Sequence, residues 1–588
     1  MAERSPVSYR VAVDPQRHEL GVEMRFTPST SSASIRVETP TWVAGDYDYM
    51  AFARDIFAIR AFDASGRELG VVRDGWQGFV VPGNTARITY RAAACAPEFA
   101  EPCGIVDDRF AIALGTRYLH LAGAEGPCRV EYQLPDDWAV HHPSGAVRTG
   151  NSAWEYPSYE ILVDTPVAMG HFDLRTRVVR GTPFHCLFVD RTVGFESGVE
   201  SLVDRLAGVG EALHDVFGSF PFEDYTFILS FNPTADWGLE HLTSTMCGLG
   251  PDVFVDPDRF AYAVRVCAHE AFHAWNVRRL RPAPLKHIDF TAGDFTQGLW
   301  VAEGFTRYYE FLLSVRAGLY TAQQFFSNAA EYFNHLAVTP AYSRVTAADS
   351  SLATYLNHSK YPGRCNNAID YYDKGMLIAF GADVALRTRT QADNLDRAFS
   401  DFYRAFVEIS PGYTPRDVFD FFDGRLPELG HEIAAQSTSL APLPVTERFK
   451  ALGFEPVIET LPYLGIVFLD SGGPEIYDIL DTSPASTAGL APGDVITKID
   501  GYPYSSMALG WVAANARTTT LEVQRGHRAL SYTLSPAQRT RVAALVWRGT
   551  PQQAGAIRTW LQAAFEPAAG QSLGVDFYQN FHGVETVV

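Results

Sequence analysis

The spacing of apolar residues changes near residue 190, and this change constrains the fold more than any other feature of the sequence. Before it, short apolar runs such as "ARITYRA" and "CRVEYQL" alternate with turn residues, which is typical of strands packed in a β-sandwich. After it, windows such as "GVESLVDRLAGVGEALHDVFG" carry apolar residues at helical spacing. The change predicts a β-rich N-terminal part and a largely helical part after it.

A chain of 588 residues is too long for one hydrophobic core, so we expect three or four domains. We predict a multidomain α+β fold. Its parts are a β-sandwich-like domain over 1–190, a largely helical region over 191–445, a compact β-rich unit over 455–540 and a final helix and tail over 541–588. The stretch 434–449, "AAQSTSLAPLPVTERF", contains Pro and Ser residues and is expected to be a linker.

Composition excludes some classes of partner. The chain has 48 basic and 68 acidic side chains and a formal charge of −20, which argues against nucleic acid. The first residues have no apolar segment typical of a signal peptide, and no run of eighteen apolar residues is present. We therefore expect no membrane contact and a cytoplasmic protein, unless a leader has been removed. Seven scattered cysteines indicate mostly reduced thiols, with a Cys95–Cys103 disulfide as the alternative.

The segment His269-Glu270-Ala271-Phe272-His273 is an H-E-x-x-H motif in a helical window. Positions i and i+4 lie one turn apart on one face of a helix, so both imidazoles can reach one metal ion. Glu270 beside them can take a proton from the metal's water. The alternative is a helix whose two histidines border a core without a metal.

A catalytic zinc site needs a third protein ligand and one open position. Glu303 follows His273 by thirty residues, in the helical window "LWVAEGFTRYYEFLL". A carboxylate in an apolar stretch is costly unless it is paired, and a metal would pair it; the alternative is an exposed helix carboxylate. Glu310, two turns along the same face, is a candidate hydrogen-bond acceptor for a ligand histidine, or else an exposed glutamate. Two His and one Glu with one open position favour one zinc ion per chain.

The extended motifs carry a family resemblance. "HEAFHAWNVRRLRP" together with "LWVAEGFTRYYEFLLSVRAGL" resembles the glycyl aminopeptidase family of gluzincin zinc metallopeptidases, whose members carry a PDZ domain. "PTWVAGDYDYMAFARDI" near residue 40, "WGLEHLTST" at 237–245 and "YYDKG" at 371–375 also match, so the resemblance covers most of the chain. It implies a thermolysin-like catalytic domain in the helical part and a PDZ-like domain after it.

The resemblance also implies an anchor for the substrate's free amino terminus. In gluzincin aminopeptidases this anchor is a glutamate in an edge-strand motif, which corresponds here to Glu240 in Gly238-Leu239-Glu240-His241. A carboxylate near the metal pairs with an ammonium group and measures one residue to the scissile bond. The alternative is an ordinary glutamate at a strand end. The family commonly has glycine where this chain has Trp237, which bears on the shape of the first side-chain pocket.

A hydrogen-bond donor for the reaction is implied in the same way. Tyr372, in "YYDKG", matches the family tyrosine that donates a hydrogen bond to the tetrahedral intermediate. A phenol with a pKa of about 10 remains protonated and can donate to a developing oxyanion. The neighbouring Tyr371 is the alternative donor, and either side chain could instead belong to the core.

The C-terminal β-rich unit resembles a PDZ domain of the bacterial protease-associated type. The resemblance rests on "YLGIVFLD" followed by "SPASTAGLAPGDVITKIDGYPYSS". In such a domain the loop Tyr463-Leu464-Gly465-Ile466 would offer backbone N–H groups to a peptide carboxylate. A C-terminal peptide ligand and a purely structural role are both open.

The sequence ends in Glu585-Thr586-Val587-Val588, which has the form of a common PDZ ligand. One hypothesis is that this tail docks into a PDZ groove, either its own or a neighbour's. The alternative is an edge strand packed on another domain.

Taken together, the motifs predict a zinc metallo-aminopeptidase that acts on peptides with a free amino terminus. The resemblance implies a preference for small first residues such as Gly and Ala. Two alternatives remain: a zinc endopeptidase with the same catalytic residues, and a non-catalytic scaffold that presents its PDZ groove to peptides.

Overall fold

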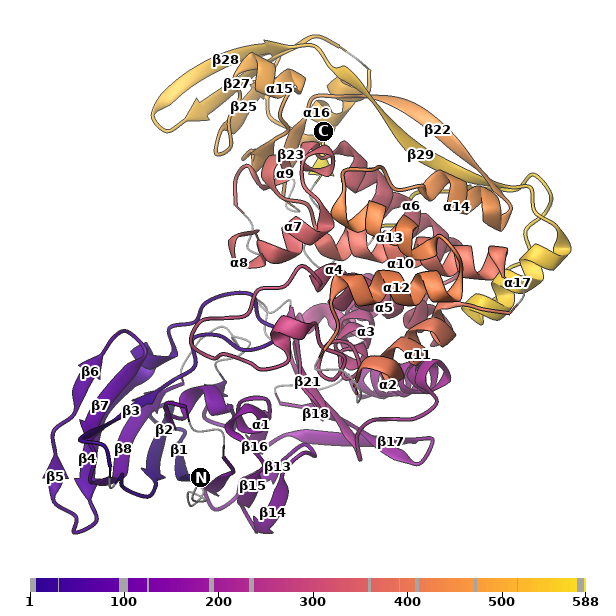
Figure 1. The fold of residues 1–588 in the computed structure, drawn as a ribbon. Helices are drawn as coiled ribbons and strands as arrows, with labels where there is room; N and C mark the ends of the chain where they lie inside the picture. The colour runs from indigo at the N-terminus through magenta and orange to yellow at the C-terminus, as the bar shows by residue number, and fades with distance from the viewer. Residues whose placement is uncertain are drawn as a thin grey trace. The chain divides into compact units, whose positions relative to one another are not determined.

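The computed structural model divides into two compact units, residues 1–294 and 295–588, and each is described by itself (Figure 1). It describes residues 7–29, 31–94, 104–123, 126–189, 195–231, 237–357, 361–390, 392–407, 412–469, 473–515, 517–578 and 586–588. Cys95 and Cys103 lie outside this set, so their pairing is not tested. The other five cysteines are free and buried, as predicted for reduced thiols. Within the described ranges, no helix is both long enough and apolar enough to cross a membrane.

The first unit begins with an eight-stranded sheet in the order β14-β15-β12-β1-β2-β8-β4-β5. In β1 the side chains of Tyr9, Val11 and Val13 are buried and their neighbours are less so, because successive residues of a strand point to opposite faces. The strands are β1 (Val7–Asp14), β2 (Glu19–Arg25), β4 (Ile56–Asp63), β5 (Glu68–Leu69), β8 (Thr85–Ala93), β12 (Cys128–Gln133), β14 (Val147–Gly150) and β15 (Ala153–Tyr156).

Two four-stranded sheets accompany it, in the orders β11-β3-β7-β6 and β13-β16-β10-β9. One apolar core contains Val11 and Ile88 from the eight-stranded sheet together with Val37 and Phe79 from β3 and β7. The predicted β-rich, sandwich-like N-terminal part is therefore present. These strands are β3 (Ser34–Glu38), β6 (Val72–Asp74), β7 (Gly78–Pro82), β9 (Ile105–Val106), β10 (Phe110–Ala113), β11 (His120–Leu121), β13 (Ala139–His141) and β16 (Val167–Gly170), with the short helix α1 (Tyr159–Val163) before β16.

A five-stranded sheet, in the order β17-β18-β19-β21-β20, completes the first unit. Its strands are β17 (Asp173–Val179), β18 (Thr182–Phe188), β19 (Tyr225–Ser230), β20 (Trp237–Glu240) and β21 (Ser244–Gly248), with helices α2 (Glu196–Phe217) and α3 (Pro257–Phe272). α3 packs against β20 and β21. It starts at Pro257 behind the N-cap Asp256, whose carboxylate accepts hydrogen bonds from the first free N–H groups of the helix.

The second unit contains a helical layer around α10 (Tyr371–Arg389), which is buried from Asp373 to Leu386. α10 packs against α4, α5, α6, α13 and α14 (Figure 1). The other helices are α4 (Leu299–Ala302), α5 (Gly304–Arg316), α6 (Ala322–Val338), α7 (Ala347–Leu352), α8 (Thr354–Asn357), α9 (Arg364–Asn367), α11 (Leu395–Val407), α12 (Pro415–Arg425), α13 (Leu429–Thr438) and α14 (Val445–Leu452).

The linker predicted over 434–449 is wrong. α13 and α14 occupy most of this stretch. Pro444 stands at the N-cap of α14, where a missing N–H costs nothing, and the buried Val445 and Phe449 pack this helix onto its neighbours. Tertiary burial therefore decides the structure of a segment whose composition is typical of a loop.

The C-terminal part combines a long strand pair with a compact β-rich unit. β22 (Phe454–Tyr463) pairs antiparallel with β29 (Ala537–Trp547), which also pairs with β30 (Ser572–Gly574). Between them lie β23 (Ile466–Phe468), β24 (Asp478–Ile479), α15 (Pro484–Ala488), β25 (Val495–Ile499), β26 (Tyr502–Pro503), α16 (Ser506–Ala514), β27 (Thr519–Arg525) and β28 (Arg528–Leu534). After the strand pair, α17 (Pro551–Leu561) forms in the predicted helical window, and β31 (Thr586–Val587) ends the chain.

Candidate active site

Two buried histidines lie at the end of α3 in the first unit. The rings of His269 and His273 have centroids 4.6 Å apart and are nearly perpendicular, at 81°. His273 Nδ1 lies 2.5 Å from the carbonyl oxygen of Asn276, and a carbonyl only accepts, so Nδ1 carries the proton. Nε2 of His273 therefore keeps its lone pair, which is the state that a metal ligand requires.

Glu270 lies between these histidines in the sequence and faces the edge strand β20. A Cβ atom at Gly238 would lie 2.4 Å from Glu270 Oε1, so a larger residue there would require the Glu270 side chain to move. The Tyr225 hydroxyl donates to the main-chain carbonyl of Glu270 over 3.2 Å and ties α3 to the sheet. Gly238, two residues before the predicted anchor Glu240, thus leaves room for the Glu270 side chain.

Glu240 ends β20, the last strand in the order of its sheet among the described residues. It pairs in register with Thr245 of β21, and Leu239 before it is buried. One oxygen each of Glu240 and Glu270 and one ring nitrogen of His273 all lie within 4.8 Å of one another. The first unit thus brings the predicted amine anchor, the predicted base and one predicted metal ligand to a single point.

A loop from the β-rich part packs directly onto the Glu240 carboxylate. Gly45 has φ +101°, and a Cβ atom there would lie 2.6 Å from Glu240 Oε2. The Trp42 indole N–H donates to the carbonyl of Asp289 over 2.5 Å and holds the loop. The loop belongs to the motif "PTWVAGDYDYM", which at the level of sequence carried only resemblance, and its glycine proves necessary for close approach.

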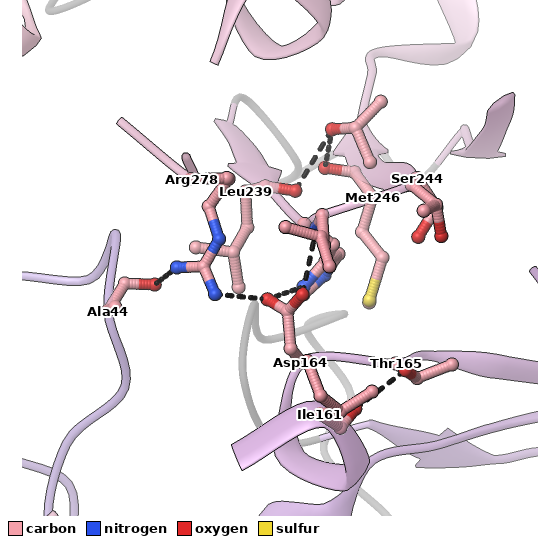
Figure 2. Close-up of polar contacts among 12 residues, drawn as sticks. Ala44, Ile161, Asp164, Thr165, Leu239, Ser244, Met246 and Arg278 are labelled. Atoms are coloured by element: carbon pink, nitrogen blue, oxygen red, sulfur yellow. Dashed lines mark hydrogen bonds and ion pairs between the residues drawn. The ribbon is translucent and has the colours of Figure 1, made fainter. Parts of the chain in front are cut away.

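A buried charge network connects this loop to the strand end that carries Glu240 (Figure 2). Asp164 Oδ1 accepts a hydrogen bond from Arg278 Nη2 over 2.6 Å and lies 3.4 Å from His241 Nδ1. Asp164 Oδ2 accepts from the N–H of Leu242 over 2.8 Å, and Arg278 Nη1 donates to the carbonyl of Ala44 over 3.4 Å. The network therefore contacts Ala44, next to Gly45, on one side and His241, next to Glu240, on the other.

The electrostatics of the network favour a charged carboxylate. Burial raises the pKa of Asp164, but the charge of Arg278 and the hydrogen bond with His241 outweigh burial and hold this pKa below its ordinary value. Sequence reasoning missed Asp164 altogether. It lies 114 residues before Arg278, outside every motif, and no local signal pairs the two.

Trp237, at the start of β20, packs against an apolar cluster that includes Phe110, Leu187 and Ile228. Leu239 lines a small cavity together with Val43 and Phe290. Both side chains therefore belong to the packing that supports the edge strand. The effect of Trp237 on the first side-chain pocket stays a prediction.

Glu303 belongs to the second unit, where it separates α4 from α5. It is 2% exposed, which excludes the alternative of an exposed helix carboxylate. Next to it, Gly304 meets Gly375 of α10 so closely that a Cβ at Gly304 would lie 2.4 Å from the Cα of Gly375. This contact brings the start of α10 to the break that holds Glu303. Glu310 is also fully buried, so it is not an exposed glutamate, and its predicted role toward a histidine stays a prediction.

Tyr372 stands in the first turn of α10. Asp370 caps this helix by accepting from the N–H groups of Tyr372 and Asp373 over 2.9 and 3.2 Å. The Arg307 guanidinium lies 4.8 Å from the centre of the Tyr372 ring. Burial first, and then the negative charge of Glu303, raise the pKa of Tyr372 well above its ordinary value, so the phenol keeps its proton.

The neighbouring Tyr371 is placed differently. Its hydroxyl lies 2.7 Å from the Thr354 hydroxyl and the residue is buried, whereas Tyr372 is partly exposed. The two rings stack with centroids 4.9 Å apart. Tyr372 is thus the more exposed residue of the two, and its role as the oxyanion donor stays a prediction.

The loop after β22 binds the end of the chain. The N–H groups of Leu464, Gly465 and Ile466 donate to the Val588 carbonyl oxygen over 3.0, 2.8 and 3.3 Å. Tyr463, the first residue of the predicted loop, pairs instead with Ala537 as the last residue of β22. Three of the four predicted loop residues therefore surround one oxygen.

Comparisons with known proteins agree with these motifs. The family model described as M61 glycyl aminopeptidase matches residues 262–378, and the Peptidase M61 N-terminal domain matches residues 8–171. No curated protein matches the chain by sequence.

Among solved structures, an aminopeptidase N family protein from Idiomarina loihiensis is 18% identical, with a TM-score of 0.84, over 94% of this chain and 100% of that chain. At this identity the likeness concerns the fold alone. An M1 zinc metallopeptidase from Deinococcus radiodurans is 16% identical, over 75% of this chain and 96% of that chain, and its TM-score of 0.44 is too low to support an argument. The family models cover the segments that hold the H-E-x-x-H motif, Glu303 and Tyr372, together with the β-rich N-terminal part. The chain therefore carries two domains of the M61 glycyl aminopeptidase family, over residues 8–171 and 262–378, and is a peptidase.

Proposed function

We propose that this peptidase is a zinc-dependent aminopeptidase that hydrolyses the first peptide bond of peptides with a free amino terminus. The observation that carries the proposal is the meeting of Glu240, Glu270 and His273 within 4.8 Å. A buried carboxylate this close to the base pairs with the substrate ammonium and leaves room for one residue before the scissile bond. An endopeptidase needs no such second carboxylate.

The donor set fits zinc, and we propose His269, His273 and Glu303 as the ligands of one ion per chain. Two imidazoles and one carboxylate are the ligands of many catalytic zinc sites. The hydrogen bond from His273 Nδ1 to Asn276 orients one ring as metal ligands require. When bound, zinc supplies Lewis acidity and lowers the pKa of its water.

The chain's own groups carry the proton transfers. Glu270 accepts the proton of the attacking water and returns it to the leaving amine. Tyr372, protonated because its pKa is raised, donates a hydrogen bond to the oxyanion as charge develops there. β20 is the last strand in the order of its sheet among the described residues, a position suited to pairing with an extended substrate backbone.

A preference for small first residues such as Gly and Ala is part of the proposal. The Gly45 backbone approaches the Glu240 carboxylate closely enough to exclude a Cβ atom. We expect a backbone this close to the carboxylate to limit the room for the first side chain of a substrate. The Asp164–Arg278 pair binds the carbonyl of Ala44, next to Gly45, and would keep this backbone in place.

The test is mass-spectrometric cleavage of one Gly-Ala-initiated peptide by the zinc-loaded enzyme, with its amino terminus free and then acetylated. Release of glycine from the free form alone is the expected result. Equal cleavage of both forms would identify an endopeptidase on the same residues. No cleavage of either form would favour a non-catalytic peptide-binding scaffold.

A further inference from the structure

The C-terminal β-rich unit holds an oxygen of Val588 in a ring of backbone donors. Leu464, Gly465 and Ile466 donate three consecutive N–H groups to it, and the N–H of Val588 donates back to the carbonyl of Ile466 over 2.9 Å. Successive N–H groups that converge on one point form a site for an anion. The terminal carboxylate of a peptide is an anion of this kind.

The tail also adds a strand to the unit. β31 pairs antiparallel with β23, with Val587 opposite Val467 and Thr586 opposite Phe468. The Val588 side chain packs against the core of the unit, which includes Leu464, Leu509 and Val512. Main-chain pairing and one apolar contact thus hold the tail as they would hold a peptide added to a sheet edge.

The loop is shaped for this purpose by Gly465. Its φ of +80° is in the left-handed region, and a Cβ atom there would lie 2.1 Å from the Cβ of Ser483. Only glycine allows the backbone to turn its N–H toward Val588 at this point. A loop that served packing alone would not need three donors aimed at one oxygen.

The tail contacts a second cluster outside the groove. Val587 packs against Cys365 of α9, together with Val467 and Leu480. α9 is joined to the unit by hydrogen bonds, since the Cys365 N–H donates to Asp478 Oδ2 over 3.2 Å. The seated tail is therefore held by the β-rich unit and by the helical layer together.

We propose that Thr586–Val588 is the resident ligand of a binding site for free peptide C-termini. The site takes an extended peptide that ends in a small aliphatic residue with a free carboxylate. The tail occupies it from within the same chain, and a second peptide binds only after displacing the tail. An attached ligand competes at an effective concentration near millimolar, which weakens the binding of other peptides without any new contact.

The test uses the peptide Gly-Val-Glu-Thr-Val-Val with fluorescein on its amino terminus, measured by fluorescence polarisation. The full chain is compared with a variant that lacks residues 586–588 and with a variant extended by Gly-Ser-Gly after Val588. All three carry Glu270→Gln, so that peptidase activity does not affect the result. The intact mass of each protein verifies its terminal residue.

We expect both tail variants to bind the peptide at least tenfold more tightly than the full chain, and the C-terminally amidated peptide to bind none of them. Equal affinity for the full chain and both variants would overturn the resident tail. Absence of binding to every protein, or equal binding of the amidated peptide, would overturn the carboxylate site.

Hydrogen exchange gives a second measurement that needs no added ligand. The amides of Leu464, Gly465 and Ile466 should be protected in the full chain and exchange at least tenfold faster in the variant without residues 586–588. Addition of the free-carboxylate peptide should restore protection. Unchanged exchange in the variant would contradict the proposal.

Discussion

Two regions of this molecule for which we propose recognition roles are built in opposite ways. Around Glu240, side chains from three distant segments hold one another in place, as the contacts of Asp164 with Arg278 and His241 show. In the C-terminal unit, three consecutive backbone N–H groups bind one oxygen, and the loop that presents them requires a glycine. The first design depends on charge and on long-range packing. The second depends on backbone conformation, so substitutions should affect the two regions differently.

The largest expected effect is on the side-chain site. Glu270→Gln removes the base and should lower kcat by about 10³-fold, because general base catalysis contributes about 10² to 10⁴. Zinc content measured by elemental analysis should remain that of the unsubstituted enzyme. Glu331→Gln, a buried carboxylate of α6, is the matched control and should leave kcat within about twofold. Loss of zinc in parallel with activity would contradict the role of Glu270 as a base.

The second largest expected effect is a loss of stability when the buried network around Asp164 is broken. Asp164→Asn leaves Arg278 charged and buried, which should lower the free energy of unfolding by about 3 to 5 kcal/mol and raise KM for peptides with a free amino terminus. The exposed pair Arg416–Asp420 is the control, and Asp420→Asn should change stability by less than about 0.5 kcal/mol. Denaturant unfolding and KM for free and acetylated peptides are the measurements.

The pH dependence of the same variant follows from the lowered pKa of Asp164. A lowered folded-state pKa contributes stability that is present above the unfolded value, about 3.9, and is lost as pH falls through the folded value. The difference between Asp164→Asn and the unsubstituted chain should therefore shrink below about pH 4. A difference that grew in acid would show that the pair does not stabilise the charged carboxylate.

Lys374 offers a contrast to Asp164, because its ammonium group is buried without the hydrogen-bonded partners that surround the Asp164 carboxylate. Within the described residues its Nζ has no hydrogen-bond partner, and burial lowers its pKa to about 8. Between this value and the unfolded pKa of about 10.4 the unfolded chain binds more protons, so stability rises with pH in that window. Lys374→Met should raise the free energy of unfolding by about 3 kcal/mol at pH 7. The gain should fade above about pH 10, and a destabilised variant at pH 7 would refute the assignment.

The site formed by the N–H groups of the loop at Gly465 should be sensitive to the addition of a single methyl group. Gly465→Ala places a Cβ against Ser483 at positive φ and should lower the free energy of unfolding by about 1 to 2 kcal/mol, with loss of carboxyl-terminal peptide binding. Gly526→Ala is the matched control, since its φ is +58° and nothing lies within 4 Å of the added Cβ. That control should cost about 1 kcal/mol and keep peptide binding. Equal peptide affinity in both variants would show that the loop conformation does not matter.

Local patterns predicted much of this molecule. Period-2 alternation indicated the β-rich start, and helical spacing indicated α3, α10 and α17, because these elements bury one face or all faces in a regular way. The motifs with H-E-x-x-H, Glu303 and Tyr372 were visible because each lies within a few consecutive residues. The supposed linker at 434–449 was wrong, since composition does not report which residues a neighbouring helix will cover.

The sequence by itself determined the residue types of the proposed site, the order of its motifs and the family that its two matched domains resemble. Only the tertiary structure decided that Gly45 meets Glu240, that Gly238 makes room for Glu270 and that Asp164 finds Arg278. It also decided that the N–H groups of the loop at Gly465 meet Val588. The physical reason is how far apart along the sequence the residues of each contact lie. A motif records neighbours along the chain, whereas these contacts join segments that packing brings together and that no local pattern pairs in advance.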